Sequence, residues 1–315
     1  MPSERETTLL TVAAVRRATP RAGTEVLFLE RERIFTIAEK GSAGAALAKR
    51  LKAAIRGKTP LRVTLDQKRG TVVRAVEGGE EEVRAFRAAR VRLPDPERSF
   101  RVDLAKIDPT RFNLVDRYLK ARVFRRCRRV IPNYLAAKQI FDFCAGQSCH
   151  LPGPPSFPPC IPFQYVRDGC YARAHQMRKI ITTRYRYCCE KVFSFANVPP
   201  DQLRVQAAKW GGCCVAWWYH VAPFVRVRVR IGSCRFTVGM VIDPSMFDKP
   251  VLLSTWLGAQ ENATCGSNAH VSMYSIQPGS AYGPANYSGT AFVTDPGYVG
   301  TNATLAGYQS LTTCP

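Results

Sequence analysis

The stretch DGCYARAH, residues 168–175, places Cys170 where a helix should begin, and the helical pattern continues to about Arg184. Asp168 and Gly169 suit a turn immediately before that helix. The N-terminus of a helix carries unpaired N–H groups and partial positive charge, which lower the pKa of a thiol and favour the thiolate. We therefore expect Cys170 to be a nucleophile. The alternative is that it forms half of a disulfide.

A base and an orienting carboxylate follow on two strand-like segments, as His220 in WWYHVAP and Asp243 in VIDPS. If the two segments form an antiparallel hairpin in which His220 faces Asp243, paired residue numbers add up to 463. Gly232 and Ser233 then supply the turn. Directly opposed residues have Cβ atoms about 4.5–5.5 Å apart, so Asp243 could hold the imidazole. A Cys-His-Asp triad predicts covalent acyl-transfer chemistry.

Composition divides the chain near residue 130. Residues 1–130 hold 31 Lys and Arg against 16 Asp and Glu, a net charge of +15, whereas residues 131–315 have a net charge of +7. All four tryptophans lie after this point, as do eleven of the twelve cysteines. With 315 residues and 46% hydrophobic content, the chain can form one large domain or two ordinary ones. We expect two parts, residues 1–129 and 130–315.

The cysteines indicate an oxidising compartment, because cytosolic reductants keep thiols reduced. Setting Cys170 aside leaves ten cysteines after residue 131, enough for five disulfides, with Cys170 as the one free thiol of this part. Cys149 and Cys160 bracket a proline-rich loop that they could staple. We predict a secreted protein, although the N-terminal sequence contains no evident signal peptide. No apolar run is long enough for a membrane-spanning helix.

The secondary structure indicated by the sequence is mixed. The first part should be a small α/β unit, and the second should contain helices, two long strands and a tail of loops and short strands. The expected segments are strand 24–30, helix 43–57, a hairpin over 61–77 turning near Arg69 and Gly70, a short helix in 78–91, an extended connector over 93–112, helices 113–124, 131–146 and 170–184, and strands 214–230 and 235–242.

Arginines crowd the junction as Arg125, Arg126, Arg128 and Arg129. A basic run between two compositionally different parts should be exposed and is an attractive protease target. The alternative is a merely solvated helix end. The high net charge does not by itself indicate nucleic acid, since arginines alternate with valines over 225–230 as on the solvated face of a half-buried strand.

Four aromatic residues flank the expected site and are candidates for a substrate groove: Tyr171, Trp217, Trp218 and Tyr219. Some of them should instead belong to the core, because neighbours on a strand point to opposite faces. Zinc binding is a weaker alternative, since the pairs 188–189 and 213–214 are adjacent rather than spaced as CxxC. We expect no metal and no cofactor.

With these residues in view, the chain resembles the bacterial protein-glutaminase family, also called protein-glutamine deamidases. The likeness runs from about Val130 to Cys265 and is carried by DGCYARAHQMRKI, CCEKVF, CCVAWWYHVAPFV and VIDPSMF, with AGQSC and PPCIPF nearer its start. It covers all three positions of the expected triad.

The resemblance implies an α+β fold with a papain- or transglutaminase-like core, and hydrolysis of glutamine side chains in proteins and peptides to glutamate and ammonia. It assigns Cys170 as nucleophile, His220 as general acid/base and Asp243 as orienter. It also implies a secreted zymogen, whose pro-region, here residues 1–129, blocks the cleft until a protease removes it. The expected partners are protein substrates with exposed glutamine and an activating protease, and the protein is expected to act as a monomer away from membranes and nucleic acid.

The triad alone leaves other functions open. A transglutaminase would use the same thioester with an amine acceptor, and a cysteine protease would attack the backbone carbonyl. A disulfide-rich binding module without catalysis would bridge Cys170.

Overall fold

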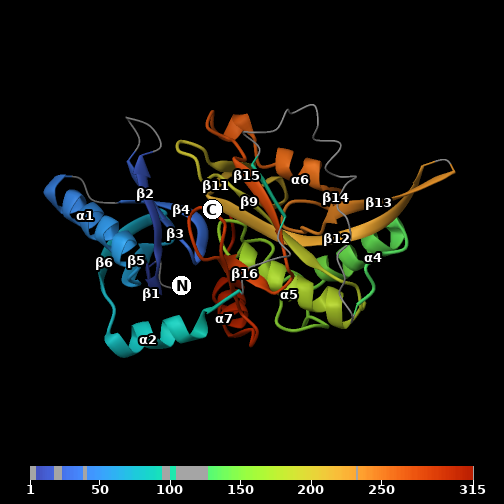
Figure 1. Cartoon of the computed structure of the whole chain (residues 1–315), viewed down its shortest axis with the longest axis horizontal. Coiled ribbons are helices and arrows are strands. Elements are labelled where there is room, and N and C mark those ends of the chain that lie inside the picture. The colour runs from blue at the N-terminus through green and yellow to red at the C-terminus, as the bar shows by residue number, and fades with distance from the viewer. Residues whose placement is uncertain are drawn as a thin grey trace.

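The computed structural model of the chain describes residues 5–17, 23–37, 41–93, 100–103, 127–231 and 233–314. Within these ranges it has six α-helices and three β-sheets (Figure 1). The expected α+β class is confirmed. Among the helices of the described segments, none combines the length and apolar character that a membrane span requires.

The N-terminal part is a sheet with one long helix on it. Helix α1 packs on strands β2 and β6, and the apolar side chains between helix and sheet form a separate core around Leu51, Val63 and Phe35. The elements are β1 (Arg5–Leu10), β2 (Val12–Arg17), β3 (Thr24–Phe28), β4 (Arg31–Ile37), α1 (Gly41–Gly57), β5 (Leu61–Asp66) and β6 (Thr71–Glu77).

The sequence predicted several of these elements. Strand β3, helix α1 ending at Gly57 and the β5–β6 hairpin are confirmed. Gly70 has a φ of 66° in that turn, a left-handed backbone conformation that favours glycine. The short helix is α2 (Glu80–Ala89). The helix expected over 113–124 lies outside the described residues.

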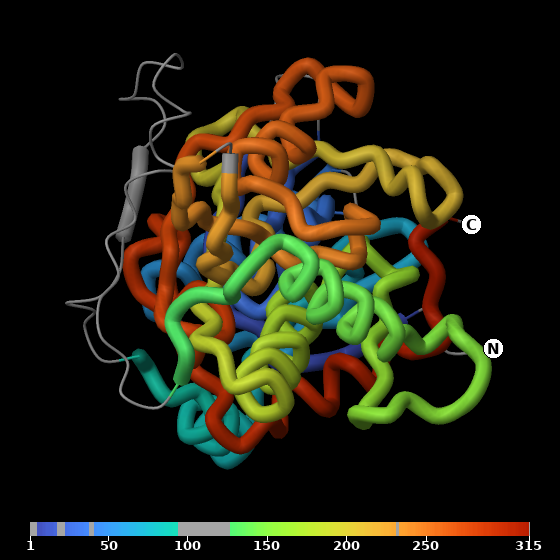
Figure 2. Tube along the Cα trace, turned by 90° about the vertical axis from the view of Figure 1, so that its right-hand side faces the viewer, coloured from blue at the N-terminus to red at the C-terminus, as the bar shows by residue number. Residues whose placement is uncertain are grey.

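A six-stranded sheet organises the second part, with strand order β14-β13-β12-β9-β15-β8, in which the edge strand β8 (Phe100–Asp103) comes from the N-terminal part. Helices α4 and α5 pack on strand β12, and α6 packs on β13 and β14. Figure 2 shows the green coil of α4 next to the yellow-green coil of α5. Separate apolar clusters surround Val225 and Trp256. The elements are α4 (Tyr134–Ala145), α5 (Cys170–Thr183), β9 (Glu190–Phe195), β12 (Tyr219–Ile231), β13 (Cys234–Val241), β14 (Val251–Leu252), α6 (Leu253–Gly258) and β15 (Met273–Gln277).

The N-terminal part adds a strand to each sheet of the second part. Strand β4 pairs with β11 (Cys214–Trp217), which pairs with β10 (Leu203–Gln206). Strand β7 (Val91–Arg92) pairs with β17 (Phe292–Thr294), the partner of β16 (Ala281–Pro284), and β8 (Phe100–Asp103) pairs with β15. Three backbone pairings therefore fasten the two parts together.

Two expectations for the second part need correction. The expected strand 214–230 is two strands in different sheets, β11 and β12, with Trp218 between them. The tail is not only loops and short strands, because it contains helix α6 and helix α7 (Val299–Tyr308). Short 3-10 turns, η3 (Ala208–Trp210) and η4 (Ala263–Cys265), complete the elements.

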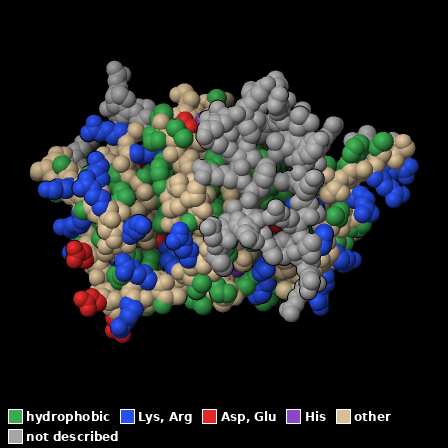
Figure 3. Space-filling model, in the orientation of Figure 1, with side chains coloured by type: hydrophobic (Ala, Val, Ile, Leu, Met, Phe, Trp, Pro, Cys, Tyr) green, Lys and Arg blue, Asp and Glu red, His purple; other side chains and the backbone are tan. Residues whose placement is uncertain are grey.

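The arginine–valine alternation of strand β12 behaves as the sequence indicated. Val225 and Val227 are buried, whereas Arg228 and Arg230 are exposed. Figure 3 shows Lys and Arg side chains on the N-terminal part and at the opposite end of the molecule, where the β12–β13 hairpin lies. These arginines form a solvated face of the sheet.

Candidate active site

Cys170 is the first residue of helix α5, as expected, and its side chain is buried. The preceding Gly169 has a φ of 89°, and a Cβ on it would lie 2.9 Å from the ring of Tyr308. Only glycine meets both conditions, so the turn that presents Cys170 depends on Gly169. The Cys170 backbone N–H points away from the helix and donates to the carboxylate of Glu32 at 3.1 Å.

His220 lies on strand β12 and contacts Asp243, which follows strand β13. Its Nε2 is 2.9 Å from Oδ2 of Asp243, and the same oxygen accepts a 2.9 Å hydrogen bond from the Trp256 indole N–H. The ring of Trp217 stacks on the imidazole, with centroids 4.4 Å apart and planes 11° apart. The carboxylate and the indole ring together fix the orientation of the imidazole.

The predicted hairpin register is wrong by two residues. Paired residues add up to 465, as in Phe224–Val241 and Arg230–Arg235, rather than 463. The strand pairing stops at Val241, and Asp243 lies beyond it. The Ile242 N–H still donates to the carbonyl of Pro223 at 3.0 Å, and the next residue, Asp243, contacts His220 beyond the last strand pair. Gly232, half of the expected turn, is outside the described residues.

A residue of the N-terminal part completes the cluster. Glu32, on strand β4, is fully buried, and its two carboxylate oxygens have different partners. One oxygen, Oε1, accepts from the Cys170 N–H at 3.1 Å and from the Arg173 guanidinium at 3.3 Å. The other, Oε2, lies 3.1 Å from Nδ1 of His220. Glu32 therefore lies between the thiol-bearing helix and the imidazole.

The backbone of Glu32 is held on both sides. Its N–H donates to Oδ1 of Asp168 at 3.1 Å, and its carbonyl accepts from the N–H of Trp218 at 3.0 Å. The neighbouring Arg33 pairs with Trp217 across the β4–β11 ladder. The segment around Glu32 is thus bound to the second part as an extended peptide.

Burial and the nearby charges at the cluster disfavour the thiolate of Cys170. Burial, followed by the charge of Glu32, raises the pKa of Cys170 well above its usual value, and the nearby Arg173 only partly opposes this. The effect expected from the helix N-terminus is therefore outweighed in the full chain. Burial alone would lower the pKa of His220, but its hydrogen bonds to Asp243 and Glu32 raise it. Burial would raise the pKa of Asp243, but the hydrogen bond to His220 lowers it.

These shifts predict that the full chain loses stability at alkaline pH. Because the pKa of His220 is higher in the folded than in the unfolded chain, protonated His220 stabilises the fold. This stabilisation is fully present below the pKa of the unfolded chain, about 6.5, and is lost as the pH rises through the pKa of the folded chain. The raised pKa of Cys170 acts in the same direction above about 8.5. Thermal unfolding of the full chain followed from neutral to alkaline pH should show this loss. The loss of stability with rising pH should be smaller in Glu32→Ala. An equal loss in the two proteins would contradict the assignment of part of these pKa shifts to Glu32.

The four aromatic residues proposed for a groove lie around the cluster in different ways. Trp217 covers His220, and the Trp218 indole donates to the carbonyl of Arg31 at 2.7 Å. The Tyr171 hydroxyl is 3.3 Å from the guanidinium of Arg31. Tyr219 joins Tyr171 in lining a cavity of about 1010 Å³ between the two parts of the chain. All four side chains are buried in the full chain.

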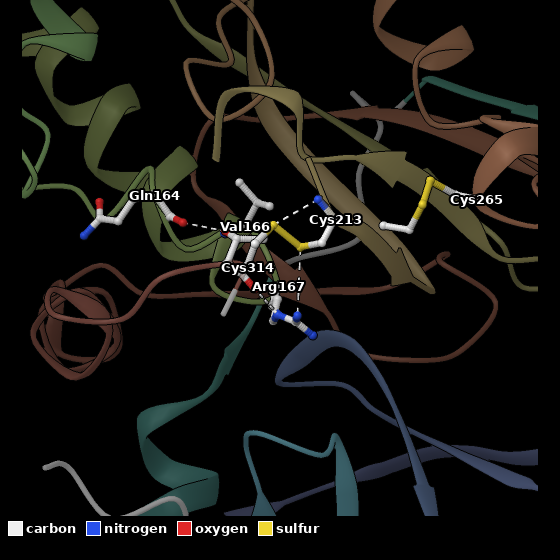
Figure 4. Close-up of a disulfide and its surroundings, with 8 residues drawn as sticks. Gln164, Val166, Arg167, Cys213, Cys265 and Cys314 are labelled. Atoms are coloured by element: carbon white, nitrogen blue, oxygen red, sulfur yellow. Dashed lines mark hydrogen bonds between the residues drawn. A yellow bond between two sulfur atoms is a disulfide. The ribbon is translucent and has the colours of Figure 1, made fainter. Parts of the chain in front are cut away.

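Disulfides anchor the segment that leads to Cys170. The Cys213–Cys314 bridge ties the C-terminal residues to the loop before β11, and Arg167 lies 3.9 Å from the Cys213 sulfur (Figure 4). Its guanidinium also donates to the carbonyl of Thr313. Because Arg167 directly precedes Asp168, this bridge helps to fix the turn into helix α5.

The disulfides differ from the five that the even number of cysteines after residue 131 suggested. The Cys149–Cys160 bridge is confirmed, and the structure also pairs Cys127–Cys188 and Cys214–Cys265. Five bridges within residues 131–315 are excluded, because Cys127 takes one of those cysteines. Cys170 is free as expected but is not the one free thiol, since the structure leaves as thiols Cys144, Cys170, Cys189 and Cys234.

The basic run at the junction is only partly described. Arg125 and Arg126 lie outside the described residues. Arg128 and Arg129 are both exposed, as expected. The Arg128 N–H donates to the carbonyl of Arg186 at 2.9 Å, and its guanidinium lies over the ring of Tyr187. Residue 128 is therefore already bound to the second part.

The same cluster contains the one group of potential metal ligands found among the described residues. The ligand atoms of Glu32, Cys170 and His220 lie within 4.8 Å of one another. Thiolate, imidazole and carboxylate are a ligand set that zinc accepts. Here Oε1 of Glu32 accepts the Cys170 N–H, and Oε2 faces Nδ1 of His220. The hydrogen-bonding capacity of this carboxylate is therefore used by the protein itself.

Sequence reasoning did not identify Glu32, Arg173 or Trp256 as site residues, and it treated Asp168 only as a turn residue. Arg173 gave a weak signal, because it lies one turn after Cys170 in the same helix. Glu32 gave none, since a glutamate in an alternating strand is ordinarily solvated.

Comparison with known proteins points to one family. A family model described as Glutaminase matches residues 137–260. A crystal structure of pro-protein-glutaminase is similar over 99% of this chain and 95% of that chain, with 25% identity and a TM-score of 0.72. The sequence comparison with curated proteins gives no match.

Two further structures match over part of the chain. A crystal structure of protein-glutaminase is 36% identical, covering 59% of this chain and 91% of that one, with a TM-score of 0.50. The NMR structure of protein-glutaminase from Chryseobacterium proteolyticum is 34% identical with the same coverage and TM-score. The motifs, the Cys170–His220 cluster and these likenesses agree, and the chain belongs to the protein-glutaminase family.

Proposed function

We propose that this protein is a zymogen that, once processed, hydrolyses protein- and peptide-bound glutamine side chains to glutamate and ammonia. One observation carries the proposal: the Glu32 carboxylate is bound by the Cys170 N–H and faces His220, as the glutamate product of that reaction would be. Membership of the protein-glutaminase family supports the same reaction.

In the proposed reaction the Cys170 thiol gives its proton to Nδ1 of His220, and Sγ attacks the carboxamide carbon of a bound glutamine. The resulting oxyanion takes the place of Glu32 Oε1, where the Cys170 N–H stabilises it and the Arg173 guanidinium is the second donor. His220, now imidazolium, gives the Nδ1 proton to the amide nitrogen, the C–N bond breaks, and ammonia leaves. A thioester between Cys170 and the substrate remains.

Water then completes the cycle. His220, now neutral, takes a proton from water, which attacks the thioester carbon. The C–S bond breaks, glutamate leaves, and Cys170 is restored. Asp243, held by the Trp256 indole, orients the imidazole and stabilises its charged form. This assigns Cys170, His220 and Asp243 as the catalytic triad, with Tyr171, Trp217, Trp218 and Tyr219 around the substrate.

Residues 1–129 are proposed as the inhibitory pro-region and residues 130–315 as the catalytic domain with a papain- or transglutaminase-like core. The buried position of Glu32 between Cys170 and His220 supports the inhibitory role. Four disulfides support secretion, where an extracellular protease could act on the run from Arg125 to Arg129. We place the activating cut after Arg125 or Arg126, since a cut after Cys127 would leave the pro-region tethered through Cys188. Residues 127–129 then stay with the catalytic domain, and the released pro-region is three or four residues shorter than 1–129.

Incubation of the trypsin-treated protein with a glutamine peptide tests the proposal. Deamidation predicts one ammonia per peptide and a mass increase of about 1 Da, because NH₂ is replaced by OH. Cross-linking to an amine would indicate a transglutaminase, and backbone cleavage without ammonia would indicate a protease. If neither ammonia nor any new product forms, the binding-module alternative is favoured.

A further inference from the structure

The contacts of Arg31, the residue before Glu32, indicate how the processed enzyme selects its substrate. We propose that Asp168, Tyr171 and Tyr308 form a subsite for a basic side chain immediately N-terminal to the target glutamine. The inference rests on the proposed function, because it takes the segment around Glu32 as bound in the manner of a substrate.

The carboxylate of Asp168 fixes this subsite relative to the reacting side chain. Its Oδ1 accepts the backbone N–H of Glu32 at 3.1 Å, and its Oδ2 lies 3.1 Å from the guanidinium of Arg31. One carboxylate thus contacts both the backbone of the target position and the side chain one residue earlier. A substrate bound through the same backbone contact would place its preceding side chain at Oδ2.

Two tyrosines shape the subsite for a cation. The Tyr308 hydroxyl donates to Oδ2 of Asp168 at 2.6 Å and accepts from Arg31, and the Tyr171 hydroxyl is 3.3 Å from the same guanidinium. The guanidinium carbon also lies 5.7 Å from the centroid of the Tyr308 ring. A carboxylate, two hydroxyl acceptors and an aromatic ring favour a guanidinium or an ammonium over a neutral or acidic side chain.

All three subsite residues belong to the second part of the chain, so they remain after processing. Asp168 is fully buried in the full chain, where Arg31 is its ion-pair partner. Removal of the pro-region takes away this cation and the Glu32 N–H together. The nearby Arg173 does not replace Arg31, because one of its nitrogens donates to the backbone carbonyls of Tyr165 and Asp168 rather than to the carboxylate. A substrate with Arg or Lys before glutamine restores both lost contacts.

The alternative is that the Arg31–Asp168 pair only fastens the pro-region. The two interpretations differ in the processed enzyme. We would measure kcat/KM for ammonia release from acetylated, amidated peptides Gly-X-Gln-Gly, where X is Arg, Lys, Ala or Glu. A charge-assisted contact predicts that Arg exceeds Ala by about tenfold, falling at high ionic strength, and that Glu is poorer than Ala.

Two substitutions place the preference in this subsite. Asp168→Asn keeps an oxygen for the substrate N–H but removes the charge, so the Arg-to-Ala ratio should fall close to one. Tyr308→Phe should lower the ratio by about threefold or more, because one hydroxyl partner is lost. Tyr298→Phe is the matched control: that hydroxyl accepts from Arg178 instead, and the ratio should not change.

Deamidation of the Arg and Ala peptides at equal rates would overturn the subsite and leave the proposed function intact. An Arg preference that persists in Asp168→Asn would also overturn it. Failure to release ammonia from any peptide would refute the proposed function itself, and the subsite with it.

Discussion

Replacing Cys170 with alanine in the processed protein should lower kcat/KM for glutamine deamidation by about 10⁴-fold or more. The proposed reaction passes through a bond to Cys170 Sγ, so no other side chain of the cluster can take its place. Ammonia release from a glutamine peptide measures the loss.

The other free thiols provide the control for this substitution. Cys234 is exposed on strand β13, and Cys234→Ala should leave activity unchanged. Cys144 and Cys189 are buried, and burial raises the pKa of both thiols, so neither is a ready nucleophile. Retention of activity in Cys170→Ala, with loss in Cys234→Ala, would show that the nucleophile is misassigned.

Processing should raise activity by about 10³-fold, because a full chain with Glu32 bound exposes its site only in a small open fraction. In the intact protein Glu32 both fills the site and raises the pKa of Cys170. Peptide deamidation before and after limited trypsin treatment measures the gain.

A chain in which Arg125, Arg126, Arg128 and Arg129 are all changed to glutamine is the control. It should stay inactive for as long as trypsin leaves this junction uncut. Gels with and without reductant locate the cut relative to Cys127, since the Cys127–Cys188 bridge retains any fragment cut after it. Equal activity of the intact and processed proteins would refute inhibition by the pro-region.

Local patterns predicted the local structure well. Apolar periodicity located helix α1, and the turn residues at Arg69 and Gly70 located the β5–β6 hairpin. Helix α7 was missed because VGTNATLAGY contains two glycines and little helix propensity. Its formation depends on packing of Leu305 and Tyr308 into the fold, which the local sequence does not report.

Long-range contacts were predicted less well. The His220–Asp243 contact was expected, but from a strand register that is off by two. The two residues are not a strand pair, because the last pair of the ladder is Phe224–Val241. The contact of Glu32 with Cys170 joins residues 138 positions apart on different parts of the chain. No periodicity encodes such a contact. Cysteine parity failed for a similar reason, since Cys127 lies before the assumed boundary.

The central claim is that residue 32 places its side chain where the glutamine of a substrate reacts. Its most direct test is the full-length Glu32→Gln protein in H₂¹⁸O, with peptide mapping of residue 32 by mass spectrometry. We expect the introduced glutamine to become glutamate with ¹⁸O, an increase of about 3 Da, and we expect no such change when Cys170→Ala is combined with it. Glutamine that persists at residue 32 in the protein with Cys170 intact would contradict the claim.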